Sequence, residues 1–165
     1  EACIQRDPDR ADAYLALADI RRKHGEFEDA SRLYRKVLSL DPDHRLASTM
    51  LADVLMKQGQ IEDAVGLLEP LANRTPVLDR TLLCLGQAYL QLKDYDKARD
   101  TLERLVGLDP EESAAHYALS RAYTRLGLHD ESRAHREQFT RLSKSSREIQ
   151  KTSREYDDAR IVRGL

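Results

Sequence analysis

The residues of this sequence that could bind a metal ion or act as a nucleophile are few and widely spaced. They are His24, His44, His116, His129, His135, Cys3 and Cys84. No two histidines are four residues apart and no HExxH sequence occurs, so the spacing does not support zinc binding on one helix face. The two cysteines cannot complete a four-ligand zinc site without several histidines close by. We therefore expect no metal site, and we expect both cysteines to be reduced packing residues.

Sequence motifs for nucleotide binding and covalent catalysis are also missing. The chain has no GxGxxG, no GxxxxGK[ST] and no GxSxG, so it has neither a glycine-rich phosphate loop nor the common serine elbow. Acidic pairs such as Glu111 with Glu112 stand beside expected helix starts, where negative charge interacts favourably with the helix dipole. We expect no catalytic residues, no cofactor and no enzymatic activity.

The composition argues against two further classes of function. The 165 residues include 27 Lys and Arg and 29 Asp and Glu, for a formal net charge of −2. Proteins that bind nucleic acid usually carry an excess of positive charge, so we expect no nucleic-acid partner. No apolar run approaches the roughly 18 residues of a membrane helix, and the first residues lack the pattern of a signal peptide. We expect a soluble segment without membrane contact; its compartment stays open, with the cytoplasm favoured.

A period of 34 residues organises the chain. The residues that recur at this interval are Pro8, Pro42, Pro76 and Pro110, together with Leu17, Leu51, Leu85 and Leu119. Between the prolines, apolar residues follow a spacing of three and four, which is typical of helices. Glycines at 25, 59 and 127 stand where the first of two helices should end, because glycine readily adopts the conformation of a helix C-terminal cap. Each period should therefore hold two helices. We expect them near 11–24, 27–40, 45–58, 61–73, 79–92, 95–108, 113–126 and from 129 onward.

These features resemble the tetratricopeptide repeat family, whose repeats are 34-residue helix-turn-helix units with a small residue after a leucine and a proline at the end. The small residues at the matching positions are Ala18, Ala52, Gly86 and Ser120. The resemblance divides the chain into the end of a preceding repeat (1–10), four units (11–44, 45–78, 79–112 and 113–146) and a charged C-terminal extension (147–165). It implies an all-α fold, a right-handed α-solenoid of stacked antiparallel helix pairs with a C-terminal capping or extension helix.

Stacking such pairs leaves an extended curved surface. The resemblance implies that the first helix of each pair lines its concave side. The residues expected there are Asp19, Asp53, Met50, Met56, Arg80, Leu83, Gln87, Leu90, Tyr117, Arg121 and Arg125. Exposed apolar groups flanked by charge suit an extended peptide or an amphipathic helix, although ordinary helix surfaces carry the same residue types. We predict a noncatalytic protein–protein interaction scaffold that binds a peptide or helix of a partner in this groove.

Alternatives stay open at both ends of the chain. Because residues 1–10 resemble part of another repeat, the array could be the accessory or regulatory region of a larger polypeptide that contains an enzyme domain. At the other end, the charged extension could be a solvated capping helix, could pair with a partner helix, or could lie against a neighbouring molecule or the array's own groove. Contact with a neighbouring molecule predicts self-association through residues 147–165.

The groove hypothesis predicts that Leu83→Glu or Leu90→Glu abolishes capture of the partner while the array stays folded, because each places a charge among the apolar anchors. Pull-down together with circular dichroism measures both properties. Unchanged capture by a natively folded variant would contradict the hypothesis.

Overall fold

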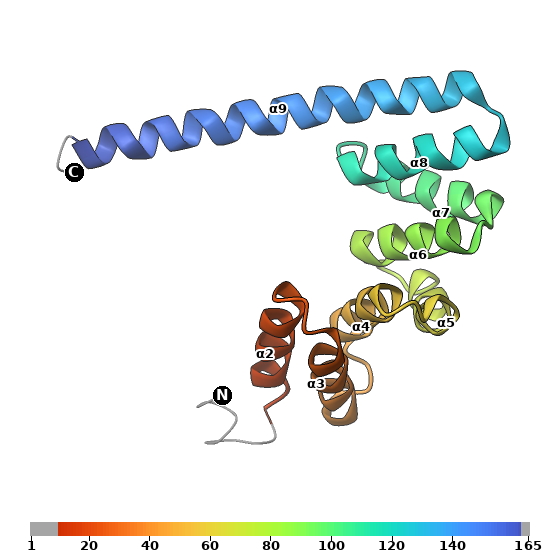
Figure 1. The fold of residues 1–165 in the computed structure, drawn as a ribbon, viewed down its shortest axis with the longest axis vertical. Coiled ribbons are helices and arrows are strands. Elements are labelled where there is room, and N and C mark those ends of the chain that lie inside the picture. Colours follow the sequence, from red (N-terminus) through yellow and green to blue (C-terminus); the bar gives the residue numbers. More distant parts are fainter. Residues whose placement is uncertain (1–9, 163–165) are drawn as a thin grey trace.

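A computed structural model describes residues 10–162 of the chain, and in this range every regular element is a helix (Figure 1). The helices are α2 (Ala11–Lys23), α3 (Phe27–Leu40), α4 (Arg45–Lys57), α5 (Ile61–Ala72), α6 (Asp79–Leu92), α7 (Tyr95–Leu108), α8 (Ser113–Leu126) and α9 (His129–Val162). The expected helix positions agree with these bounds to within one or two residues, apart from the last helix, for which no end was predicted. The predicted end of a preceding repeat lies almost wholly outside the described residues.

The helices form antiparallel pairs that stack along a curve, as the predicted α-solenoid requires (Figure 1). Each helix packs on the next in sequence, and α6 also contacts α4 and α8. The first helices of the pairs, α2, α4, α6 and α8, lie nearer the open side of the curve than α3, α5 and α7 do. Helix α9 is the second helix of the last pair. It continues without a break into the predicted extension and projects far beyond α8.

The core is a continuous layer of side chains shared between neighbouring helix pairs. Its largest fully buried members include Tyr34, Leu68, Leu82, Leu102, Leu105 and Leu119. One polar contact crosses this layer, where the buried hydroxyls of Thr49 in α4 and Thr81 in α6 are 2.8 Å apart. A buried hydroxyl without a partner would cost free energy, so this pair keeps the α4–α6 contact satisfied.

Two hydrogen bonds repeat along the stack with the period of the sequence. The hydroxyl of Tyr89 in α6 donates to Glu69 in α5 at 2.5 Å, and that of Tyr123 in α8 donates to Glu103 in α7. In each case a first helix is joined to the second helix of the preceding unit. Burial and the neighbouring carboxylate raise the pKa of both tyrosines well above their usual range, so both hydroxyls remain donors. These bonds add directional contacts to a stack held mainly by apolar packing.

The turns between paired helices use the left-handed backbone conformation. Gly127 ends α8 with φ 78°, as the sequence predicts. At the equivalent position of the third unit the residue is Lys93, which nevertheless adopts φ 63°. A residue with a Cβ is less stable than glycine in this region by roughly 1 kcal/mol.

At Gly86 two helices approach closely, because its missing side chain leaves room for Leu102 of α7. A Cβ at Gly86 would lie 2.5 Å from Cγ of Leu102, and Leu102 is fully buried. We therefore expect Gly86→Ala to lower the free energy of unfolding by about 1–3 kcal/mol through overpacking. Urea denaturation measures this change. The matched control is Gly66→Ala in α5, where an added Cβ meets open space. This substitution should raise the free energy of unfolding by about 0.5–1 kcal/mol, because alanine is more stable than glycine inside a helix. Equal effects of the two substitutions would contradict the close approach at Gly86.

Candidate partner-binding surface

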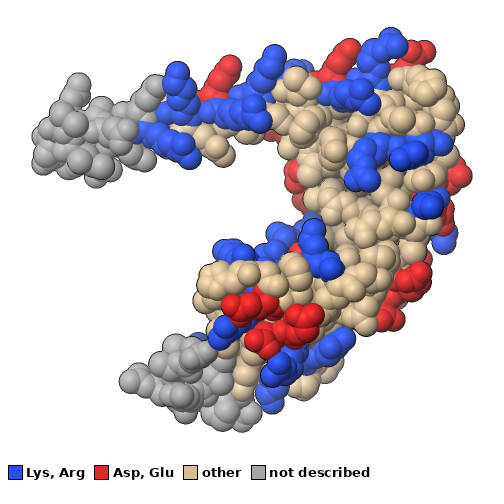
Figure 2. Space-filling view, viewed as in Figure 1, with Lys and Arg blue, Asp and Glu red and all other residues tan. Residues whose placement is uncertain are grey.

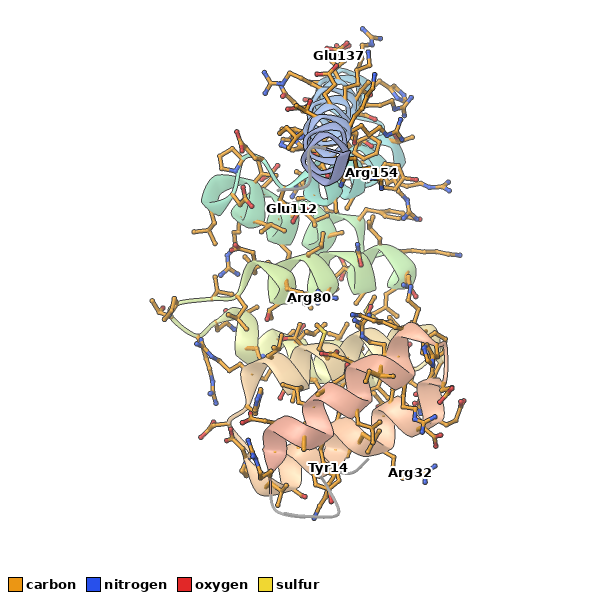
Figure 3. All side chains as sticks on the ribbon, turned by 90° about the vertical axis from the view of Figure 1, so that its left-hand side faces the viewer. Tyr14, Arg32, Arg80, Glu112, Glu137 and Arg154 are labelled. Carbon is orange, nitrogen blue, oxygen red and sulfur yellow. The ribbon has the colours of Figure 1, made fainter. Side chains whose placement is uncertain are left out.

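All residues predicted for the concave side lie on the first helices of the four pairs, but they differ in how much of each side chain is exposed. Arg80, Tyr117, Arg121 and Arg125 are exposed. Figure 3 looks into the open side of the curve and shows Arg80 on the face of α6 turned toward it. Leu83 and Gln87, on the same helix, Asp19 on α2 and Asp53 on α4 are partly exposed.

The prediction that the apolar members are exposed is wrong for three residues. The relative solvent exposure of Met50, Met56 and Leu90 is only 3%, 6% and 7%, because these side chains pack against neighbouring helices in the core. They cannot offer large anchors to a partner. Leu90→Glu would bury a carboxylate in that core, so we now expect it to destabilise the array itself. Leu83 remains usable for the test because it is partly exposed.

The two predicted acids are brought together, but they face the protein's own cations. Arg22 Nη1 lies 3.5 Å from Oδ2 of Asp53, and Arg22 Nε lies 3.7 Å from Oδ1 of Asp19. Asp19 also accepts a 2.5 Å hydrogen bond from the hydroxyl of Tyr34, which together with burial raises the pKa of that tyrosine well above its usual range. This cluster joins α2, α3 and α4. Arg22 offsets part of the negative charge of the two aspartates, and the cluster links the three helices.

The cationic end of the surface has a different arrangement. A cavity of about 620 Å³ opens between α6, α8 and α9. Its lining includes Lys93, Tyr95, Tyr117, Arg121, Arg125 and Arg136, which we call the basic pocket. Tyr117 is 50% exposed and its ring centroid lies 5.2 Å from that of Phe139. The pocket therefore combines positive charge with an accessible aromatic surface.

Sequence reasoning identified only part of this pocket. Tyr117, Arg121 and Arg125 were predicted, because they lie on the first helix of a unit. Lys93, Tyr95 and Arg136 were missed, because they come from the turn after α6, the start of α7 and α9. One signal was present at Lys93, which replaces the glycine of the other three units.

The buried histidine His116 is paired with His135 across the α8–α9 contact. Their Nδ1 atoms are 2.8 Å apart, and Nε2 of His116 lies 3.0 Å from the carbonyl oxygen of Pro110. Because a carbonyl only accepts, Nε2 of His116 carries its proton. The neutral ring then accepts at Nδ1 from His135. The ring of His135 stacks on Tyr123 at 5.3 Å. Burial and the nearby His116 lower the pKa of His135 below its ordinary value of 6.5, while Glu103 acts in the opposite direction.

The described residues contain no group of three or more His, Cys, Asp or Glu side chains arranged to hold a metal ion. Cys84 is a buried free thiol, and burial raises its pKa to about 11. Cys3 lies outside the described residues. Helices with the length and apolar character needed to cross a membrane are not found between residues 10 and 162.

Comparison with known families identifies the repeats. A family model for subunit 3 of the anaphase-promoting complex, or cyclosome, matches residues 23–105, and a tetratricopeptide repeat model matches residues 83–143. The chain belongs to the tetratricopeptide repeat family. Arrays of this family are protein-interaction scaffolds and are generally noncatalytic. No curated protein sequence matches the chain.

Solved structures of MamA have the same tetratricopeptide architecture. The MamA fragment from residue 41 to the end from Desulfovibrio magneticus RS-1 is 26% identical, with a TM-score of 0.76 over 86% of this chain and 80% of that one. MamA AMB-1 is 27% identical, with a TM-score of 0.71 over 84% and 82%. Another MamA crystal structure, at 20% identity, has a TM-score of 0.77 over 89% and 86% and supports the fold alone.

The paired histidines generate a prediction about pH. Because the pKa of His135 is lower in the folded state, the unfolded chain binds more protons as the pH falls below about 6.5. The free energy of unfolding of the tetratricopeptide array should therefore have its full value above about pH 6.5 and decrease as the pH falls from there toward about 5. His135→Asn keeps an N–H donor toward His116 and should reduce this dependence. Urea midpoints at several pH values measure it.

The matched control for this experiment is His129→Asn, which removes an exposed histidine from the start of the same helix. An equal pH dependence for wild type and His135→Asn would show that the histidine pair does not couple protonation to folding.

Proposed function

We propose that this chain is a noncatalytic scaffold that binds a segment of another protein on the concave surface formed by α2, α4, α6 and α8. The observation that carries the proposal is the accessible aromatic and cationic surface at one end of that side. Tyr117 is half exposed there, and Arg121 and Arg125 extend beside it from the same face of α8. Aromatic and arginine side chains are the types enriched at binding hot spots.

The remainder of the surface supports such a role in a different way. Arg80 is exposed in the middle of the array, with Leu83 and Gln87 partly exposed further along the same helix. Leu46 at the start of α4 is 41% exposed. These side chains are spread over successive helices, which suits contact with an extended or helical segment rather than with a small molecule.

Selection from a random library of displayed twelve-residue peptides tests the proposal without knowledge of the natural partner. We expect peptides that bind the folded chain and slow hydrogen exchange in α6 and α8. Tyr117→Ala should weaken their binding at least tenfold, because truncating a hot-spot residue costs about 2 kcal/mol or more and about 1.4 kcal/mol corresponds to tenfold.

The matched control is Leu108→Ala, which removes another exposed apolar side chain, 59% exposed at the end of α7. It should leave the affinity unchanged. The absence of any binding peptide would contradict the proposal, and so would protection confined to α3, α5 and α7.

A further inference from the structure

We propose that the basic pocket is a docking site for an acidic segment of a partner protein, with an apolar side chain of that segment seated beside Tyr117. This inference rests on the proposed function and specifies the chemistry of the partner. Four cations, Lys93, Arg121, Arg125 and Arg136, line one cavity of about 620 Å³. No Asp or Glu is part of that lining.

The four cations of the pocket have no ion-pair partner among the described residues. Elsewhere, Arg22 pairs with Asp53, Arg74 with Asp43, and Arg99 with Asp96 and Asp100. Within residues 10–162, no ion pair or hydrogen bond involves the side chains of Lys93, Arg121, Arg125 or Arg136. Grouping unpaired like charges in a concavity raises their mutual repulsion. An acidic ligand would relieve that repulsion, so the pocket is complementary to negative charge.

Apolar surface also lines the pocket, so positive charge alone does not define the ligand that fits it. Tyr117 is 50% exposed, and Tyr95 and Leu90 contribute further apolar surface to the lining. Contact of Tyr117 with Phe139 of α9 holds its ring at the edge of the cavity. An apolar side chain could displace water from this surface while flanking carboxylates meet the arginines. The pocket therefore fits a segment in which Asp and Glu surround an aromatic or aliphatic residue.

The backbone at Lys93 provides independent support. This residue occupies the left-handed turn position, with φ 63°, where Gly25, Gly59 and Gly127 stand in the other units. Glycine would be the more stable choice at that position. The lysine instead adds a positive charge to the pocket. A gain in binding at the expense of local stability accounts for this departure from the repeat.

Helix α9 extends the positive surface beyond the pocket. Arg136, Arg147 and Arg154 are all exposed. About three helical turns separate Arg136 from Arg147, and about two turns separate Arg147 from Arg154, so the three side chains project from the same side of α9. Figure 2 shows Lys and Arg side chains along this helix. Glu137 instead projects from the side of α9 away from the repeats (Figure 3). From Arg136 to Arg154 the row is about 27 Å long at 1.5 Å per residue. An extended acidic segment of about eight residues would span it.

Peptide selection against paired variants tests the chemistry of the partner. A random twelve-residue display library selected on the wild-type chain should become enriched in Asp and Glu around an aromatic or aliphatic residue. The enrichment should disappear on the double variant Arg121→Glu and Arg125→Glu. The control Arg32→Glu and Arg35→Glu makes the same change in charge on the exposed face of α3 and should retain it.

Fluorescence anisotropy then measures affinity for a labelled peptide taken from the selection and for its counterpart with Gln in place of Glu and Asn in place of Asp. The neutral counterpart should bind at least tenfold more weakly. Lys93→Gly should raise the melting temperature and weaken the binding of the acidic peptide several-fold. Because the variant is the more stable protein, its loss of affinity cannot come from unfolding.

The outcomes separate this inference from the proposed function. If the selected peptides bind the concave side through Tyr117 without acidic enrichment, the proposed function stands and the acidic-segment inference is overturned. If no peptide binds, both fail. Tighter binding of a twelve-nucleotide single-stranded DNA, lost in the Arg121 and Arg125 double variant, would make the pocket a nucleic-acid site and overturn the inference. A wild-type oligomer that this double variant dissociates would make a second copy of the chain the occupant, with the same consequence.

Discussion

The fold depends on one packing constraint: no single helix pair of this chain can bury its own apolar side. Each pair covers the next, and the recurring leucines Leu51, Leu85 and Leu119 are buried in this layer, whereas Leu17 of the first unit is partly exposed. The contact is close at Gly86, where Leu102 fills the space a side chain would need. Because this packing repeats with a small rotation from pair to pair, the stack curves and its first helices gather on the open side. The binding surface is therefore a geometric consequence of how the core is built.

The two ends of that surface use charge differently. Near the N-terminal end, Asp19 and Asp53 lie around Arg22, and a tyrosine hydroxyl from α3 completes the cluster. These charges hold neighbouring helices together. Near the C-terminal end, Arg121 and Arg125 have no ion-pair partner among residues 10–162 and line a cavity with the aromatic ring of Tyr117. An array of nearly neutral net charge thus contains one strongly positive site, a distribution that the total of −2 conceals.

Helix α9 gives the array its asymmetry. Its first turns form the second helix of the last pair, and they pack on α8 through buried Ser132 and the His116–His135 pair instead of a fully apolar stripe. The rest of the helix extends away from the stack, and its side chains from 144 to 152 are exposed and mostly polar or charged. Polar packing suits a terminal helix whose outer face receives no further repeat. MamA structures share the fold over most of both chains, so this type of curved stack is compatible with considerable sequence divergence.

The sequence alone determined the helices, their pairing and the repeat family, because those depend on local periodicity and on a 34-residue interval that recurs throughout the chain. It also predicted Tyr117, Arg121 and Arg125 for the concave side, and all three are exposed residues of α8. It failed for Met50, Met56 and Leu90, since a helical period shows which face a residue occupies but not how closely the neighbouring pair covers that face. Only the tertiary structure joined Lys93 and Arg136 to the same pocket, because the turn after α6 and the helices α8 and α9 meet there through the stacking of the last two pairs.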